Sequence, residues 1–434
     1  MRPTAAKLRS SGSPGPRTGA DKRPTAFVDA MAERDLAKFL QLLYTYDHAK
    51  ALALFDKLIP DEANFWTIAD ALLLVCANHQ DAKLTVPHGL QTVEAAREMF
   101  TVAGPEASLG LLRFVTLYSF SLVKRDWTAT YLEGQAAAVK GDPEPMLWEA
   151  ITSGQWDRAA ALACAIATQS GLAAASHALV SASLADLGRL AHNFTLAASY
   201  AEAARELGMP LGLVPLANGA RFLATTLRSS RPFRPEAYET PPPDTEASLE
   251  ALQRELAGGE YGAVHNVLRR HAASDDRERV FEPLLIGVSK DPGFLGHNLI
   301  LAHSARLAAK YLATEELSHL LWKLYRTLGK SYEYPADLAV RRRPDRDAQA
   351  AITGLKATLQ HRTPPPLVTI GQCLEAGVPL EGVLKQIVGG YSAWRVGEKE
   401  HTIVYLNAAV QTAQFLGPEK ALLPLAVALQ QLPF

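Results

Sequence analysis

Cysteine is scarce in this chain of 434 residues, and its scarcity excludes several classes of protein. Only Cys76, Cys164 and Cys373 are present, far apart and without a Cys-x-x-Cys pair. This pattern excludes a disulfide framework, a zinc ribbon and a cysteine-ligated metal cluster. It favours a reducing compartment, and we expect a cytoplasmic protein.

The chain also lacks an excess of either charge and lacks a long apolar run. It has 44 Lys and Arg against 45 Asp and Glu, so a general nucleic-acid or anionic-membrane binder is not expected. The longest apolar run, Leu109 to Val123, contains Arg113 and is too short to cross a bilayer. Residues 1–25 are basic and proline-containing without an apolar core, which predicts a disordered tail rather than a secretory signal.

Sheet-forming patterns and the common catalytic motifs are missing as well. We find no alternating β-branched runs joined by Asn-Gly or Asp-Gly turns, no G-x-S-x-G, no H-E-x-x-H and no P-loop. Apolar residues instead recur at three- and four-residue spacing in Ala- and Leu-rich segments such as 147–163 and 317–328. The sequence therefore predicts an all-α fold.

A proline-rich stretch divides the chain into two predicted helical halves. Residues 229–247 hold five prolines and cannot continue a helix, so we interpret them as a linker. The N-terminal half then covers residues 26–228 and the C-terminal half residues 248–434.

A histidine recurs at an almost constant interval, each time at the start of a helical pattern. The spacings between successive histidines are 104, 105 and 104 residues, although the chain has only 12 histidines. These histidines are His88, His192, His297 and His401. Residues 186–194 and 291–299 share the pattern Asp-x-Gly-x-Leu-x-His-Asn-apolar. We interpret the chain as four pseudo-repeats of about 104 residues, paired two and two around the linker.

Each period contains one helix before the histidine helix and one after it. The preceding helices are expected at 69–77, 177–185, 282–289 and 381–390, and the following ones at 109–117, 211–223, 317–325 and 421–429. A period this long favours a closed, pseudo-symmetric helical body as much as an open superhelix.

The position of each histidine at a helix start suggests a chemical role. A helix N-terminus presents partial positive charge, which keeps the imidazole neutral, and neutral imidazole binds transition metals or acts as a general base. Pseudo-symmetry can bring the four rings together. All-imidazole ligation suits iron, with copper or zinc as alternatives.

A structural role is the competing interpretation. A histidine at each helix start can cap the helix through one ring nitrogen, for example by bonding the carbonyl of the preceding turn. Ser, Thr, Asp and Asn are the more efficient caps, so the choice of histidine four times favours a further role.

Other polar residues accompany the four histidines. The residue six positions after each is Glu94, Ala198, His303 or Asn407, and three of these are polar within apolar helices. His303 is expected to support a site, by contacting the substrate or a metal ligand, or else to be a satisfied core histidine. Asp186 and Asp291 either orient the histidine six residues later or cap the Asp-x-Gly turn.

The histidine segments resemble the questin oxidase-like family. The family motif with two histidines six residues apart is similar to His297–Ala305, and its acidic-His-x-Ile motif is similar to Glu400–Ile403. A third motif is similar to the segment from His192 to Ala201. The resemblance follows motif order over residues 70–420, with Val404 in place of the family's lysine.

This resemblance implies an oxidoreductase that oxygenates an aromatic or polyketide-type small molecule. The four repeat histidines would then be metal ligands or acid–base residues, and His303 and Glu400 would be catalytic. A requirement for NADPH is implied by the resemblance alone, since no G-x-G-x-x-G follows a strand. Aromatic walls of a substrate pocket are expected from Tyr200, Tyr405, Trp394 and Trp322, unless they belong to the core. The alternative is a non-enzymatic helical-repeat scaffold for protein partners, which would leave the histidines far apart.

Overall fold

The computed structural model describes residues 34–59, 63–80, 88–187, 191–227, 246, 248–258, 261–274, 277–328, 333–393 and 400–432. The predicted N-terminal tail, residues 1–25, lies outside this part of the chain. So does the predicted linker, residues 229–247, apart from Glu246.

The prediction of an all-α fold is confirmed. The only strands in the described ranges are β1 (His79–Gln80) and β2 (Val123–Lys124), a short antiparallel pair. The helices up to residue 226 are α2 (Arg34–Tyr44), α3 (His48–Leu58), α4 (Ala63–Ala77), α5 (His88–Ala103), α6 (Pro105–Ser119), α7 (Ala129–Ala137), α8 (Pro143–Thr152), α9 (Trp156–Ser170), α10 (Leu172–Ser183), α11 (His192–Leu207) and α12 (Leu213–Thr226).

The C-terminal half has the same character. Its elements are α13 (Leu249–Gly258), α14 (Tyr261–Ala272), α15 (Phe281–Lys290), η2 (Phe294–Gly296), α16 (His297–Ala308), η3 (Ala309–Tyr311), α17 (Thr314–Leu328), η4 (Ala336–Leu338), α18 (Ala348–His361), α19 (Pro366–Glu375), α20 (Leu380–Ala393), α21 (Glu400–Leu416) and α22 (Leu422–Gln431). Each helix expected before or after a histidine is present, as α4, α10, α15 and α20 and as α6, α12, α17 and α22.

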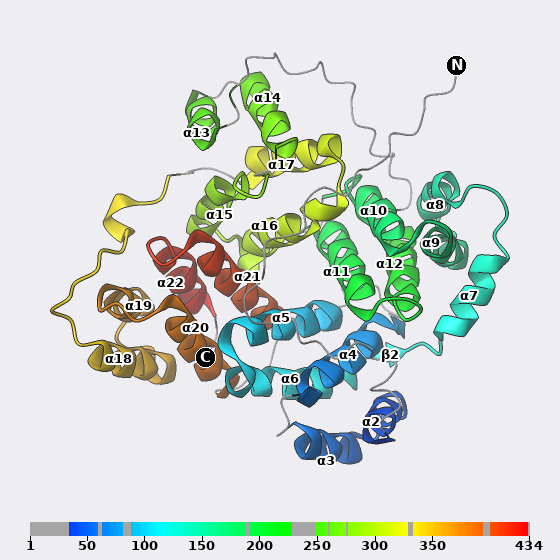
Figure 1. Cartoon of the computed structure of the whole chain (residues 1–434), viewed down its shortest axis with the longest axis horizontal. Coiled ribbons are helices and arrows are strands. Elements are labelled where there is room, and N and C mark those ends of the chain that lie inside the picture. Colours follow the sequence, from blue (N-terminus) through cyan, green and yellow to red (C-terminus); the bar gives the residue numbers. More distant parts are fainter. Residues whose placement is uncertain are drawn as a thin grey trace.

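The four histidine helices lie together in the middle of the molecule (Figure 1). Helix α5 packs against α11, α11 against α16, α16 against α21, and α21 returns to pack against α5. We call this closed arrangement of α5, α11, α16 and α21 the central ring. It joins the two predicted halves of the chain directly, because two of its helices come from each half.

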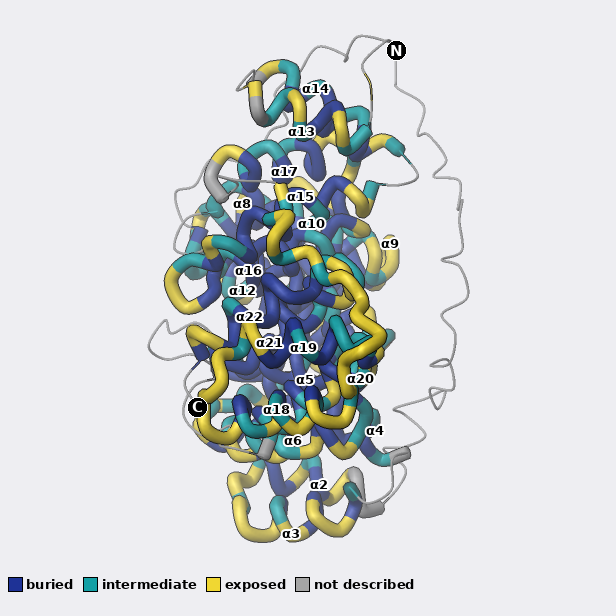
Figure 2. The backbone as a smooth tube through the Cα atoms, turned by 90° about the vertical axis from the view of Figure 1, so that its left-hand side faces the viewer, coloured by how far each residue is buried: buried dark blue, intermediate teal, exposed yellow. Residues whose placement is uncertain are grey.

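Other helices cover the central ring and bury it. Helices α4, α6 and α20 pack against α5, α10 and α12 against α11, α15 against α16, and α22 against α21. Figure 2 shows the consequence, with buried segments in the interior and exposed ones at the periphery. None of the helices in the described part of the chain is long and apolar enough to cross a membrane.

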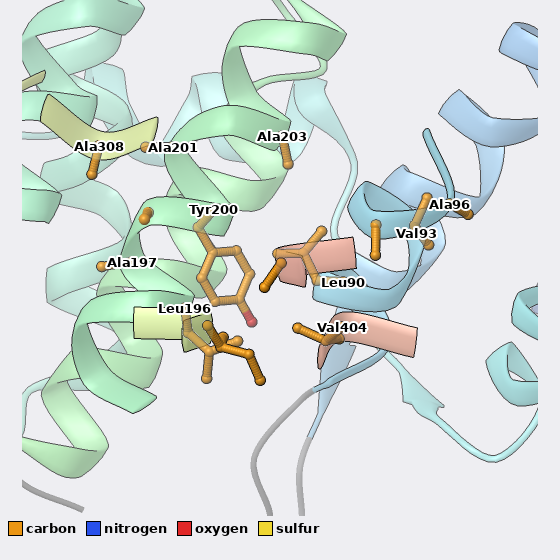
Figure 3. Close-up of a cluster of buried hydrophobic side chains, with 14 of the residues drawn as sticks. Leu90, Val93, Ala96, Leu196, Ala197, Tyr200, Ala201, Ala203, Ala308 and Val404 are labelled. Carbon is orange, nitrogen blue, oxygen red and sulfur yellow. The ribbon is translucent and has the colours of Figure 1, made fainter. Parts of the chain in front are cut away.

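The ring helices approach closely because alanine lines their contacts. Alanines of all four helices are almost completely buried, namely Ala95, Ala96, Ala197, Ala201, Ala302, Ala305, Ala408 and Ala409. A methyl side chain keeps helix propensity high while letting neighbouring backbones come near. Figure 3 shows part of this core, in which side chains of α5, α11 and α21 surround Tyr200.

Local geometry explains where α16 begins. Gly296, just before the helix, has φ of 78°, a left-handed conformation that L side chains rarely adopt. A Cβ atom at this position would lie only 2.2 Å from Cδ2 of Tyr405 on α21. The turn therefore requires glycine twice, once for its backbone angle and once for the close approach of α21.

The repeated Asp-x-Gly-x-Leu-x-His-Asn pattern ties the first turn of a ring helix to the preceding segment. Asn193 donates its side-chain N–H to the carboxylate of Asp186, at 3.1 Å. Asn298 donates to the backbone carbonyl of Asp291, at 3.0 Å. The Asp291 carboxylate accepts the N–H of Gly293 at 3.3 Å, so at this position the interpretation of a capped turn is confirmed.

A buried ion network holds three helices together on one side of the ring. Arg97 of α5 bonds Asp70 of α4 and, at 2.9 Å, Glu206 of α11. The Arg97 side chain is only 7% exposed, and its guanidinium lies 5.1 Å from the ring centroid of Trp66. Burial alone would lower the pKa of Arg97, but the two carboxylates raise it, so the group is charged.

Replacing Gly296 by alanine should destabilise the fold strongly. We expect a loss of about 2–5 kcal/mol, because strain in the left-handed conformation and overpacking against Tyr405 add together. Gly104→Ala is the matched control: its φ is 83°, but a Cβ there meets nothing within 4 Å. Urea unfolding of both variants measures the difference, and equal losses would contradict the packing argument.

Removing the buried arginine should also be costly. Arg97→Met leaves Asp70 and Glu206 without their shared cation, and we expect about 3–5 kcal/mol of destabilisation in thermal or urea unfolding. The control is Arg113→Met, whose ion pair with Asp56 is 44% and 52% exposed. That variant should lose less than about 1 kcal/mol. Similar losses of unfolding free energy in the two variants would show that burial does not determine how much an ion pair stabilises the fold.

Candidate four-histidine site

The structure brings His88, His192, His297 and His401 together, although more than 300 residues separate the first from the last. Helices α5, α11 and α16 begin at their histidine, and α21 begins one residue earlier, at Glu400. The prediction that each histidine stands at or next to a helix start is therefore confirmed. We call these four residues the histidine centre.

At one end of the central ring, each of the four imidazoles has two others as neighbours, so that the four form a closed set. The ring centroids of His88 and His192 are 5.5 Å apart, those of His192 and His297 5.1 Å, those of His297 and His401 4.4 Å, and those of His401 and His88 5.2 Å. Each histidine thus contacts its neighbours on the adjacent ring helices. The order around the centre is the order along the chain.

His297 occupies the middle of the closest nitrogen contacts. Its Nε2 lies 3.1 Å from Nε2 of His401 and 3.4 Å from Nε2 of His192. Its Nδ1 lies 2.5 Å from the carbonyl oxygen of Phe294, in the preceding turn. Because a carbonyl only accepts, Nδ1 carries the proton and Nε2 carries the lone pair that faces the other two histidines.

This arrangement gives the two nitrogens of one imidazole different roles. The bond from Nδ1 is the capping contact that the structural interpretation expected. The contacts of Nε2 are those expected of a shared centre. In metal sites, an imidazole that ligates through one nitrogen usually donates the other N–H to a carbonyl or carboxylate, which fixes the tautomer.

The surroundings of the histidine centre favour neutral rings. Burial lowers the pKa of His297 below its usual value and the charge of His88 lowers it further, whereas the bond to Phe294 opposes these effects. Four helix N-termini also meet here, and each brings partial positive charge that disfavours an imidazolium. A neutral imidazole is the form that coordinates a metal or accepts a proton.

The histidine centre is not arranged as a formed metal site in this structure. Among the described residues, no group of three or more His, Cys, Asp or Glu side chains is arranged to hold a metal ion as the rings stand. The separations, however, are those of shared ligation: two nitrogens at 2.0–2.1 Å from a tetrahedral zinc ion lie about 3.4 Å apart. The two nitrogen separations at His297, 3.1 and 3.4 Å, are close to this value.

A second polar group lies deeper in the central ring. Glu98 of α5 accepts hydrogen bonds at Oε2 from His303 Nε2, at 3.0 Å, and from Asn407 Nδ2, at 2.6 Å. These donors belong to α16 and α21, and α16 stands opposite α5 in the ring. The bond from His303 therefore crosses the interior. Burial alone would raise the pKa of Glu98, but His303, Asn407 and Arg306 lower it below its usual value.

Glu94 lies one helical turn from Glu98 and behaves in the opposite way. A hydrogen bond joins it to Ser199 of α11, and its Oε1 is buried without accepting a hydrogen bond from the described residues. Burial raises the pKa of Glu94 well above its usual value, and the charges of Glu202 and Glu98 raise it further. The surroundings of Glu94 therefore favour its protonated, neutral form. We call Glu94, Glu98, Ser199, His303 and Asn407 the inner polar cluster.

The sequence-based choice of residues found only part of this cluster. Glu94, His303 and Asn407 were selected by their position six residues after a repeat histidine, whereas Glu98 was not selected. A signal was present: Glu98, Glu202 and Gln411 each stand ten residues after a repeat histidine. Position ten is polar in three of the four helices, which marks a second inward position.

The predicted pocket aromatics and Glu400 lie in different surroundings. Tyr200, which is 1% exposed, belongs to the core (Figure 3). Tyr405, which is 3% exposed, also belongs to the core, in agreement with the alternative interpretation. Trp322 packs beside His265, with ring centroids 5.9 Å apart. Trp394 and the side chain of Glu400 lie outside the described part of the chain, so the predicted catalytic role of Glu400 stays a prediction.

The tautomer of His297 can be measured directly. We expect long-range ¹H–¹⁵N correlation spectra to show the proton on Nδ1 and a bare Nε2 at neutral pH, because the Phe294 carbonyl requires a donor. His361, exposed at the end of α18, provides a reference for an ordinary histidine. A proton found on Nε2 of His297 would contradict the assigned arrangement.

Comparison with known proteins supplies no relative from which a function could be transferred. Neither a protein-family model, nor a curated protein, nor a solved structure matches the sequence. The functional argument therefore rests on the histidine centre and the inner polar cluster.

Proposed function

We propose that the histidine centre binds a transition metal ion, iron in the first place and copper or zinc as alternatives. The protein would then be an oxidoreductase that oxygenates an aromatic or polyketide-type small molecule in the cytoplasm. The observation that carries the proposal is the meeting of His88, His192, His297 and His401 at one end of the central ring.

The lone pair of His297 gives the first supporting argument. One nitrogen lone pair accepts one well-aligned hydrogen bond, yet Nε2 of His297 has two Nε2 neighbours, at 3.1 and 3.4 Å. Protons alone leave one of these contacts unfavourable. The four imidazoles would each direct a lone pair to a metal ion held at the histidine centre, which would remove the conflict.

The donor set gives the second argument and limits the choice of metal. Imidazole suits iron, copper and zinc, whereas calcium and magnesium prefer oxygen ligands. A bound iron or copper ion supplies the one-electron and dioxygen chemistry that protein side chains lack. The oxygenation of an aromatic substrate is the activity implied by the resemblance to the questin oxidase-like family, whose motifs coincide with the histidine segments.

The side chains near the histidine centre would perform the remaining tasks. The Phe294 carbonyl fixes the tautomer of His297, and the four helix ends keep the rings neutral. His303, buried and bonded to Glu98, would support a substrate rather than ligate the metal. The three cysteines are free and buried, which suits the reducing compartment that we propose.

The competing scaffold function is less well supported. A scaffold that only stacks helical repeats has no need to gather the same residue from four distant segments. The spatial gathering of the histidines therefore favours a chemical role over a purely structural one.

Elemental analysis of the purified full-length chain tests the proposal. We expect about one iron, copper or zinc ion per chain after reconstitution, and His297→Ala should weaken the affinity by about 10- to 100-fold or more, since even indirect contacts contribute that much at metal sites. The matched control, His361→Ala, changes an exposed histidine and should retain the metal. Absence of metal from the reconstituted wild type would overturn the metal site. Metal-loaded protein is next assayed for oxygen consumption with hydroxylated aromatic compounds.

A further inference from the structure

The interior of the central ring holds two carboxyl groups whose environments are opposed. Glu94 and Glu98 stand at positions i and i+4 of α5 and share one face of the helix. Glu98 is stabilised as a carboxylate by His303 and Asn407, whereas Glu94 has one hydrogen-bonded partner, Ser199, and a buried oxygen that accepts nothing from the described residues. Two carboxyl groups one helical turn apart therefore have surroundings that favour opposite protonation states.

We propose that Glu94 and Glu98 are an acid–base pair that acts on a small molecule bound inside the central ring, with Glu94 as proton donor and Glu98 as proton acceptor. This inference deepens the proposed function and depends on it for the identity of the overall reaction. The ligand class follows from the pair: a molecule with an acidic hydroxyl for Glu98 and a carbonyl-type oxygen for Glu94.

The accessibility of Glu98 supports a role beyond structure, and the side chain of Glu94 is partly exposed although its Oε1 is buried. The side chain of Glu98 keeps 27% of its surface accessible, although His303, which reaches it across the ring, keeps only 8%. A carboxylate needed only to satisfy a buried histidine would have no reason to remain accessible. The rise of a helix places Glu94 about 9 Å and Glu98 about 15 Å along α5 from His88. The pair would therefore act on a part of the bound small molecule that is remote from the histidine centre.

The charged groups around the pair keep the two roles distinct. Glu94 faces Arg97 and Glu98 on its own helix and Glu202 on α11, and Arg97 is engaged by Asp70 and Glu206. Glu98 faces His303 and Arg306 on α16, with the neutral amide of Asn407 on α21. Negative neighbours favour the protonated form of Glu94, and the donors and the cation favour the ionised form of Glu98. Two carboxyl groups with opposed environments in one site mark an acid and a base.

The proton transfers balance without any further reactant. Glu98 removes a proton from a hydroxyl of the bound molecule and becomes a carboxylic acid. Glu94 donates its proton to an oxygen of the same molecule and becomes a carboxylate. Two O–H bonds break, in the substrate hydroxyl and in Glu94, and two form, in Glu98 and at the accepting oxygen of the substrate. No electrons are transferred to or from the protein, and the return of one proton from Glu98 to Glu94 restores the starting state.

The protonation states can be tested on the full-length chain without metal or substrate. Infrared spectra of protein labelled with ¹³C-glutamate should show, at pH 7, the carbonyl band of a protonated carboxyl group that shifts with the label. Glu94→Gln should remove this band, whereas Glu98→Gln and the control Glu106→Gln, which changes an 89% exposed carboxylate of α6, should retain it. A wild type without the band, or a band that survives Glu94→Gln, overturns the proposal.

The catalytic roles are tested by pH profiles of oxygen consumption in metal-loaded protein. Glu98→Gln should abolish the acidic limb, which Glu98→Asp should restore, and Glu94→Gln should abolish the alkaline limb, while Glu106→Gln follows the wild type. Profiles of unchanged shape in both Gln variants overturn the acid–base roles. If the metal-loaded wild type consumes no oxygen, the proposed oxygenase function is wrong. The infrared experiment then tests the protonation states of Glu94 and Glu98 by itself.

Discussion

The meeting of four helix N-termini at one point is the constraint on which this structure depends. Each N-terminus carries partial positive charge and unsatisfied backbone N–H groups, so four of them together repel one another and disfavour any cation. Neutral imidazoles at these positions add no charge to the centre. The bond from His297 Nδ1 to the Phe294 carbonyl turns the remaining lone pair inward, where it faces the positive helix ends. The histidines thus suit the electrostatics of the junction as well as the chemistry proposed for it.

Close packing makes this junction possible. Buried alanines let α5, α11, α16 and α21 approach one another, and glycine at position 296 lets the Tyr405 ring of α21 lie against the start of α16. Toward the other end of α5, the ion network of Arg97, Asp70 and Glu206 joins α4, α5 and α11. Polar contacts therefore fix the relative positions of the ring helices along their length, and apolar contacts supply most of the stability between them.

The sequence predicted the helices well because their signals are local. Apolar periodicity, glycine before a histidine and a constant interval of about 104 residues all lie within short stretches or in simple spacing. Local signals do not predict how the four histidine helices are arranged in space. Whether equivalent positions meet or remain separated depends on the angle between successive helices, and that angle results from many side-chain contacts. Periodicity alone therefore left a closed body and an open superhelix equally acceptable.

The inner polar cluster shows why single positions were harder to predict than helices. His303 and Asn407 stand six residues after a histidine, whereas the Glu98 that they bond stands ten residues after one. Positions six and ten differ by four residues, about one helical turn, so they lie on the same face of a helix at successive levels. A search restricted to one position after each histidine therefore finds only one of the two levels.

The histidine centre and the inner polar cluster lie at different levels along the ring helices. The histidines at the helix starts lie where helix ends favour lone pairs. The carboxyl groups lie deeper, where the character of each is set by its own neighbours on the other ring helices. A metal at the histidine centre and a proton pair at Glu94 and Glu98 are therefore physically independent, so that either can exist without the other.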